Sequence, residues 1–194
     1  MMPAVFLDRD GVLVEDLGPL CSMASVRVIE GVPRALRSLA QAGYRLIVVT
    51  NQTVVARGLL SEAEMALLEA EIEALIERAG APQFDGFYYC PHHPEATVSR
   101  YRMNCSCRKP RAGLLLRAGQ DRQIDLGSSF VVGDRMSDVA AGLRAGCRTV
   151  LVRSGRHGDP PIVSPEPLDD EVQPHHICAD LSAAADWILE GRSA

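Results

Sequence analysis

The chain has 194 residues, of which 47% are hydrophobic and 23% charged, and its formal net charge is −5. These values are ordinary for a water-soluble protein, and we expect residues 1–194 to form a single domain. The acidic balance disfavours nucleic acid and anionic membranes as partners, and no apolar run reaches the ~18 residues needed to span a bilayer. Asp8 comes too early for a signal peptide, so the expected location is the cytoplasm.

Five short apolar runs have the residue types of buried strands, namely residues 3–7, 44–49, 84–89, 130–132 and 149–152. Helical patterns lie between and after them, namely at 32–42, 61–79, near 113–122, near 138–145 and at 181–189. Gly43 can end the first helix, and Ser61 with Glu64 forms a capping box that opens the second. The segment 155–174, rich in Pro, Gly and Asp, predicts a surface excursion. The alternation indicates an α/β fold, a Rossmann-like parallel sheet with helices on both faces.

Three polar residues stand at the carboxyl ends of predicted strands. Asp8 follows the first strand, Thr50 the second, and Asp134 the apolar run 130–132. Ligands of open α/β sheets bind at this edge. We therefore expect the three side chains to meet at one site.

The tetrad Asp8-Arg9-Asp10-Gly11 places two carboxylates two residues apart. On an extended backbone such residues point the same way, and two carboxylates that close need a cation or a shared proton between them. Mg²⁺ with phosphate oxygens would meet that need. Read alone, the tetrad is also compatible with a solvated turn after a strand.

The segment Gly133 to Asp138 adds two carboxylates at the same edge. Asp134 is placed to complete a metal site with the first pair. Asp138 can hydrogen-bond a metal-bound water or a lysine of the site from behind the ligands. It can equally well cap the helix that follows.

Further polar groups suit a phosphate. Thr50, Asn51 and Gln52 end the second strand with hydroxyl and amide donors for a phosphoryl oxygen. Arg108 and Lys109 precede a predicted helix, and these cations can neutralise phosphate charge or grip a second anionic group.

Cysteines are concentrated in one stretch of the chain. Cys90, Cys105 and Cys107 fall within 18 residues, and His92 lies beside the first of them. Three thiolates and an imidazole form the ligand set of a tetrahedral structural zinc site, in which we favour His92 over His93. We expect residues 90–107 to be a zinc-binding insertion that also fixes Arg108 and Lys109 at the active edge.

In this order, the motifs resemble those of the haloacid-dehalogenase (HAD) superfamily of phosphotransferases. The resemblance rests on Phe6–Gly11, Val49–Gln52, Cys107–Pro110 and Val132–Asp134, and it covers roughly residues 4–153. The zinc loop is similar to that of the branch with heptose bisphosphate phosphatases and histidinol phosphatases. Ala56-Arg57-Gly58 favours the heptose side. The resemblance implies removal of the C7 phosphate of D-glycero-D-manno-heptose 1,7-bisphosphate, in ADP/GDP-heptose biosynthesis for surface polysaccharide.

The resemblance also implies roles for residues. Asp8 is the nucleophile that forms an aspartyl-phosphate, and Asp10 is the acid and then the base. Thr50 and Lys109 stabilise the transferring phosphoryl group, and Mg²⁺ is held by Asp8, Asp10 through its carbonyl, and Asp134. Arg108 binds the retained part of the substrate. The other expected substrate contacts are Asp16, Leu17, Gly18, Pro19, Asn51, Gln52, Thr53, Arg57 and Arg135.

The chain departs from the family pattern in a few places. Val12 replaces a threonine, Ala112 replaces a proline, and Thr53-Val54-Val55 replaces Ser-Gly-Ile/Leu. Loss of that glycine removes access to positive φ, which predicts a differently shaped loop over the substrate. The cap is minimal, so residues 12–30, residues 53–60 and the zinc loop should shape the pocket.

The sequence leaves one leading hypothesis and three alternatives. A monomeric phosphatase acting on a small phosphorylated sugar is the leading hypothesis. Histidinol phosphate or another small phosphomonoester is an alternative substrate. A non-catalytic phosphoacceptor domain would use similar residues, although the Asp8-x-Asp10 spacing supplies the acid–base group that makes turnover fast. A zinc-stabilised interaction module is disfavoured because every catalytic position holds a competent residue.

Overall fold

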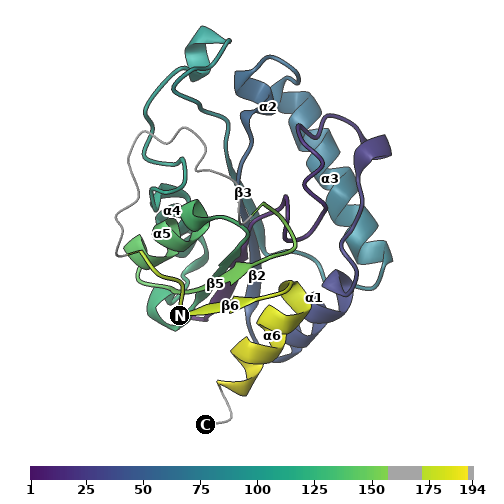
Figure 1. The fold of residues 1–194 in the computed structure, drawn as a ribbon, viewed down its shortest axis with the longest axis vertical. Helices are drawn as coiled ribbons and strands as arrows, with labels where there is room; N and C mark the ends of the chain where they lie inside the picture. The colour runs from purple at the N-terminus through teal and green to yellow at the C-terminus, as the bar shows by residue number, and fades with distance from the viewer. Residues whose placement is uncertain (157–171, 192–194) are drawn as a thin grey trace.

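A parallel sheet forms the centre of the computed structural model, which describes residues 1–156 and 172–191 (Figure 1). The strands are β1 (Ala4–Leu7), β2 (Arg45–Asn51), β3 (Gly86–Cys90), β4 (Phe130–Gly133), β5 (Arg148–Val152) and β6 (His176–Cys178). Their order across the sheet is β3-β2-β1-β4-β5-β6, and every pairing is parallel. The strands β2, β1 and β4 therefore lie side by side, which brings the residues after them to one edge.

Helices cover both faces of this sheet. They are α1 (Val32–Gln41), α2 (Thr53–Ala56), α3 (Glu62–Arg78), α4 (Gly113–Arg122), α5 (Met136–Arg144) and α6 (Leu181–Glu190), with short 3-10 turns at Met23–Ser25, Ser99–Tyr101 and Leu126–Ser128. In Figure 1, α4 and α5 lie on one side of the sheet and α1 and α6 on the other. The expected α/β fold with a doubly covered sheet is confirmed.

Alternate strand residues feed two hydrophobic cores, as a strand buried on both faces requires. Val5 and Leu7 pack in the core beneath α1, α3 and α6. Ala4 and Phe6 pack in the core that includes Leu114 of α4 and residues of α5. Asp8 is the first residue beyond this buried strand, and its backbone N–H donates to the carbonyl of Val132 in β4 at 3.0 Å.

The predicted elements agree closely with the observed ones. The capping box at Ser61 and Glu64 opens α3 with both of its hydrogen bonds, and Gly43 follows α1 with φ of 88°. Helix α5 begins at Met136, two residues earlier than expected. The sequence pattern did not predict the strand β6 or the short helix α2. Most of the predicted excursion 155–174 lies outside the described residues.

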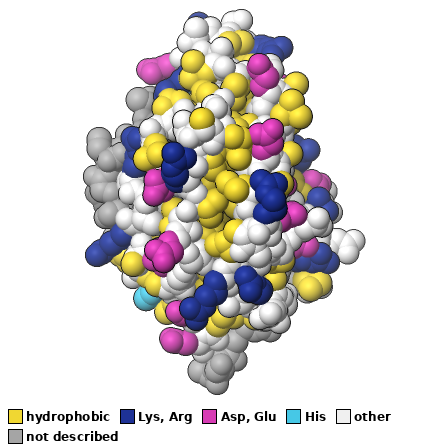
Figure 2. Space-filling view, turned by 90° about the vertical axis from the view of Figure 1, so that its right-hand side faces the viewer, with side chains coloured by type: hydrophobic (Ala, Val, Ile, Leu, Met, Phe, Trp, Pro, Cys, Tyr) yellow, Lys and Arg dark blue, Asp and Glu magenta, His cyan; other side chains and the backbone are white. Residues whose placement is uncertain are grey.

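The segment that lacks the family's glycine begins with a short helix. Residues 53–56 form α2, so Val54 has a helical backbone and needs no positive φ. None of the helices in the described ranges is long and apolar enough to cross a membrane. On the face seen in Figure 2, side chains of both charge signs are interspersed around a strip of hydrophobic atoms.

Candidate active site and metal sites

Three buried carboxylates meet at the carboxyl edge of the sheet. Asp8 directly follows β1, Asp134 directly follows β4, and Asp138 lies in the first turn of α5. One oxygen of each lies within 4.8 Å of the others. The strand order therefore brings Asp8 together with two residues that follow it by 126 and 130 positions, as the sequence predicted for Asp8 and Asp134.

The electrostatics of this cluster call for a cation. Burial, followed by the charges of Asp8 and Asp138, raises the pKa of Asp134 to about 7. Its Oδ1 is buried and has no hydrogen-bond partner among the residues that the structure describes. Mg²⁺ is a hard cation that prefers carboxylate oxygens, so the donor set fits it.

Two glycines make room for Asp134. A Cβ on Gly11 would lie 2.5 Å from Oδ2 of Asp134, and a Cβ on Gly155 would lie 2.2 Å from the same atom. Gly11 also has φ of 80°, a value that L side chains rarely adopt. Oδ2 accepts a hydrogen bond from the backbone N–H of Arg156 at 2.7 Å. The carboxylate is thus held in a slot that admits only glycine on two sides.

Lys109 supplies the positive charge that the sequence assigned to this edge. Its Nζ lies 3.2 Å from Oδ1 of Asp8 and 2.5 Å from Oδ1 of Asp138, and it donates to the carbonyl of Val49 at 2.8 Å. Burial alone would lower the pKa of Lys109, but Asp138 and Asp8 outweigh it and raise the pKa. The lysine is therefore protonated beside Asp8.

Asn51 positions this lysine. Its side-chain amide donates to the carbonyl of Lys109 at 3.1 Å, and its Oδ1 accepts from the backbone N–H of Lys109 at 3.1 Å. The end of β2 is thereby joined to the loop that carries the lysine. The amide of Asn51, expected to contact substrate, is occupied in this pair.

The carboxylate of Asp10 turns away from the cluster of Asp8, Asp134 and Asp138. It accepts from Arg9 Nε at 3.0 Å and Nη2 at 2.8 Å, and from Gln52 Nε2 at 2.9 Å. Gln52 also donates to Oγ1 of the buried Thr50 at 3.0 Å. Metal binding by Asp10 stays a prediction, which concerned its backbone carbonyl and not this carboxylate.

Asp138 combines both roles that the sequence left open. Its Oδ2 accepts from the backbone N–H of Arg135 at 3.1 Å and caps α5, while its Oδ1 pairs with Lys109. Burial, partly offset by Lys109, raises the pKa of Asp138 to about 6. The carboxylate of Asp138 is therefore close enough to Asp8 and Asp134 to share a metal ion with them, and it also pairs with the ammonium group of Lys109.

The expected substrate contacts lie around this edge in two groups. Asp16 pairs with Arg135 at 3.2 Å and with Arg156 at 3.0 Å, and it accepts from the N–H of Gly18 at 3.1 Å. Neighbouring Leu17 is exposed, and Pro19 follows on the same loop. The first group therefore brings together the 16–19 loop and Arg135, as expected.

The second group lies near the cysteine loop. Arg108 is buried and donates to the carbonyl of His92 at 3.1 Å. Burial lowers the pKa of Arg108, and the positive charge of Arg57 contributes to the lowering. Arg57 is exposed at the end of α2, whose first residue is Thr53. The positive charge of Arg57 therefore acts on Arg108 beside the cysteine loop.

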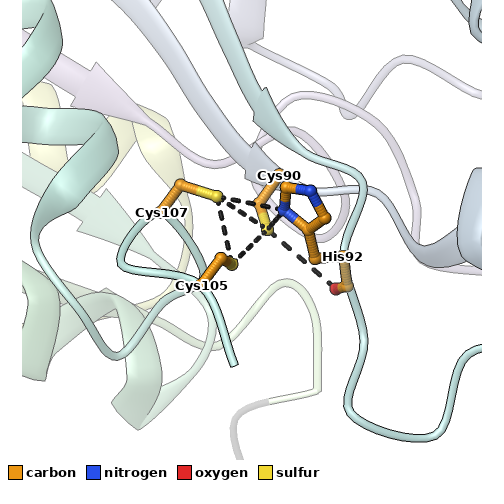
Figure 3. A group of neighbouring side chains, drawn as sticks. All are labelled: Cys90, His92, Cys105 and Cys107. Atoms are coloured by element: carbon orange, nitrogen blue, oxygen red, sulfur yellow. Dashed lines mark hydrogen bonds between the residues drawn. The ribbon is translucent and has the colours of Figure 1, made fainter. Parts of the chain in front are cut away.

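Cys90, His92, Cys105 and Cys107 form a second cluster, shown in Figure 3. The sulfur of Cys107 lies 3.3 Å from that of Cys90, 3.1 Å from that of Cys105, and 3.3 Å from Nδ1 of His92. Hydrogen bonding, first of all to Cys90, lowers the pKa of Cys107 to about 5. The four ligand atoms lie within 4.8 Å of one another, a donor set that fits zinc.

His93 takes no part in this cluster. Its Nδ1 accepts a hydrogen bond from the backbone N–H of Glu95 at 3.1 Å. The four-residue cluster contains His92 and not His93, and zinc binding through His92 stays a prediction.

Helix α3 anchors the cysteine loop from outside. The hydroxyl of Tyr101 donates to Oε1 of Glu62 at 2.6 Å, and that of Tyr89 donates to Oε2 at 3.3 Å. The hydrogen bond with Tyr101 has the largest effect on the pKa of Glu62, which it lowers, and the hydrogen bond with Tyr89 lowers it further. The loop is therefore joined to the first turn of α3.

Sequence reasoning missed several residues of the site. Arg9 stands between the two aspartates of the motif, so its position was a usable signal. Glu69 and Glu62 carried no signal, because a glutamate on a helix is usually a surface residue. Arg156 lay in a segment read as a surface excursion.

Comparisons with known proteins agree with this geometry. A family model described as HAD-hydrolase-like matches residues 106–184. The chain is similar to the D-glycero-beta-D-manno-heptose-1,7-bisphosphate 7-phosphatases of Yersinia pestis and Escherichia coli K12, with 36% and 38% identity. Each alignment covers 97% of this chain, and it covers 90% of the Yersinia pestis enzyme and 88% of the Escherichia coli enzyme. That of Haemophilus ducreyi is 43% identical over 79% of this chain and 84% of its own.

A solved structure gives the same picture. The D,D-heptose 1,7-bisphosphate phosphatase from B. bronchiseptica, complexed with magnesium and phosphate, superposes with a TM-score of 0.79 at 28% identity. The match covers 98% of this chain and 99% of the other.

Proposed function

The chain belongs to the HAD-like family of D-glycero-beta-D-manno-heptose-1,7-bisphosphate 7-phosphatases, and on this premise we propose that it removes the C7 phosphate of that bisphosphate with Asp8 as the nucleophile. The names of the relatives specify the β-anomer, and we propose the same preference here. The reaction takes place in the cytoplasm, in a single catalytic domain, and its product serves the synthesis of surface polysaccharide.

The observation that carries the proposal is the buried cluster of Asp8, Asp134 and Asp138 beside Lys109. Asp8, Asp134 and the backbone carbonyl of Asp10 would hold Mg²⁺, as the family resemblance implies. The bound ion would supply positive charge against the phosphoryl oxygens. The unpartnered oxygen of Asp134 supports this assignment.

The residues of the chain divide the remaining chemistry. The Asp8 carboxylate attacks phosphorus in line, so a P–O bond to Asp8 forms while the bond to the sugar oxygen breaks. Asp10 gives a proton to that oxygen. It then takes a proton from the water that hydrolyses the aspartyl-phosphate. Lys109 and Thr50 stabilise the charge on the transferring group.

The rim residues bind the rest of the substrate. Arg108, with Arg57 nearby, supplies positive charge for the phosphate that remains at C1. The 16–19 loop, Thr53 and Arg135 line the sugar, and Gln52 lies between Asp10 and Thr50. These two guanidinium groups supply the local positive charge that an anionic substrate needs, because the net charge of the chain is −5.

Zinc in the cluster of Cys90, His92, Cys105 and Cys107 has a structural role in this proposal. All four ligand positions are taken by protein atoms, which is the pattern of a closed site. The ion would hold the loop 90–107, and with it Arg108 and Lys109, against the edge of the sheet.

Phosphate release with Mg²⁺ tests the proposal. The substrates are the β- and α-anomers of the heptose bisphosphate and histidinol phosphate. We expect the largest kcat/KM for the β-anomer. A larger value for histidinol phosphate would overturn the substrate assignment. An acyl phosphate on Asp8 that survives for hours would instead identify a phosphoacceptor domain.

A further inference from the structure

We infer that Glu69 of α3 is a positioning residue for the acid–base group Asp10, and that it acts through the buried guanidinium of Arg9. The inference rests on the proposed function, because it concerns the proton transfers of that reaction. Neither Glu69 nor α3 belongs to the motifs at the edge of the sheet.

Arg9 is the link between the two carboxylates. Its side chain is 1% exposed, and its Nε and Nη2 make the two hydrogen bonds to Asp10 described above. Nη2 also donates to Oε1 of Gln52 at 2.9 Å, and Nη1 donates to Oε1 of Glu69. The planar guanidinium is therefore held on three sides, which fixes the direction of the fork that it presents to Asp10.

Glu69 stands at a position where α3 otherwise buries apolar side chains. It is 4% exposed, in a row with the buried Met65, Leu68 and Ile72. Carboxylates are almost never buried this deeply unless they are paired, and Arg9 is the pair. Burial lowers the pKa of Arg9, but the charges of Asp10 and Glu69 outweigh it and raise the pKa. Burial, partly offset by Arg9, raises the pKa of Glu69 to about 7.

The placement of Asp10 decides whether it can transfer a proton. A general acid must come within ~2.6–3.2 Å of the atom that it protonates. Supporting residues set this distance by locking the rotamers of the groups in front of them. Loss of the Glu69 charge would leave Arg9 drawn toward Asp10 and Gln52 alone, so the fork would shift and Asp10 with it.

The test substitutes Glu69→Gln, which retains the shape and an acceptor for Arg9 but removes the charge. Glu73→Gln is the matched control, because Glu73 lies one turn further along α3 and is half-buried. We expect Glu69→Gln to lower kcat about tenfold or more, with KM within about twofold of wild type. Glu73→Gln should leave both unchanged. Glu69→Asp, which keeps the charge on a shorter side chain, should give an intermediate kcat and is the alternative if Glu69→Gln does not fold.

A double-mutant cycle separates positioning from a general structural effect. In an Asp10→Asn background, Glu69→Gln should change the remaining rate by less than about twofold, because the group that it positions is absent. The same loss in both backgrounds, or a wild-type kcat for Glu69→Gln, would overturn the inference. A wild-type enzyme without activity on any phosphomonoester of the panel would overturn the proposed function as well.

Discussion

The ammonium nitrogen of Lys109 lies 3.2 Å from Oδ1 of Asp8, at the end of a chain of contacts that begins with Asn51. Lys109 is the only lysine in the sequence, and the other basic side chains apart from histidine are arginines. The cation beside Asp8 is therefore a compact ammonium group, whereas the other non-histidine cationic side chains of the protein are planar guanidinium groups.

Substitution of Lys109 should harm chemistry more than binding. Lys109→Met removes the charge that we propose faces the transferring phosphoryl group, and we expect kcat to fall about 10²- to 10³-fold. Lys109→Arg keeps the charge but is too large and too planar for the buried slot, so it should also lose most activity. Steady-state kinetics measure both, and a wild-type kcat for Lys109→Arg would contradict this account.

Substitution of Asp8, the proposed nucleophile, should abolish turnover without loss of the fold. Asp8→Asn keeps the size of the side chain but cannot form the aspartyl-phosphate. Phosphate release and acid-quench trapping of the phospho-enzyme measure the effect. Asp121→Asn, on the exposed side of α4, should behave like wild type. Appreciable turnover by Asp8→Asn would rule out the covalent mechanism.

Substitution of Gly11 should disturb the metal site specifically. Gly11→Ala brings a methyl group against Asp134, whereas Gly146→Ala places it in open space, and both glycines have φ near 80°. Each variant should lose about 1 kcal/mol or more of stability from backbone strain. Gly11→Ala alone should also require far more Mg²⁺ for half-maximal activity. Equal Mg²⁺ requirements in the two variants would contradict the assignment of Asp134.

The stability of the protein without Mg²⁺ should fall as the pH rises from about 4 to about 7. The pKa of Asp134 is raised from 3.8 to about 7, so across this interval the folded state binds more protons than the unfolded state. The free energy of unfolding then decreases with pH, by on the order of 1 kcal/mol per pH unit for one such carboxyl. Asp138 adds to the effect up to about pH 6.

Saturating Mg²⁺ should remove most of this dependence, because the ion stabilises the charged carboxylates. Unfolding midpoints at several pH values, in Mg²⁺-free and Mg²⁺-containing buffer, provide the measurement. A midpoint that rises with pH in Mg²⁺-free buffer would show that the carboxylates are not destabilised.

Zinc analysis should find about one ion per chain. Cys107→Ser should lose it, together with thermal stability and with affinity for the bisphosphate, since Arg108 is the next residue. Cys21→Ser should retain the zinc, because Cys21 lies outside the cluster. A fully active Cys107→Ser variant without zinc would exclude a role of the metal in placing Arg108.

The sequence was sufficient to bring Asp8 and Asp134 together at one edge of the sheet, because strand ends are local features. Asp8, Thr50 and Asp134 each follow an apolar run, and parallel strands bring such ends to one edge whatever their separation in the chain. The cysteine cluster was equally visible, because its four residues lie within one short segment.

The contacts behind the site were not predictable in this way. The pairing of Arg9 with Glu69 joins residues 60 positions apart through the packing of a helix, and neither residue type signals the other. The strand β6 has three residues, too few for a periodic pattern. Such features depend on tertiary packing and not on local sequence.

Helix α3 holds Glu62 against the cysteine loop and Glu69 against Arg9, seven residues and therefore about 10 Å apart along its axis. The length of α3 between Glu62 and Glu69 sets the distance between these two attachments. A single-residue insertion or deletion there would rotate one glutamate by about 100° relative to the other and break one of the two attachments. Length variation among related chains should therefore avoid residues 62–69 and occur instead beyond residue 79, where the helix has ended.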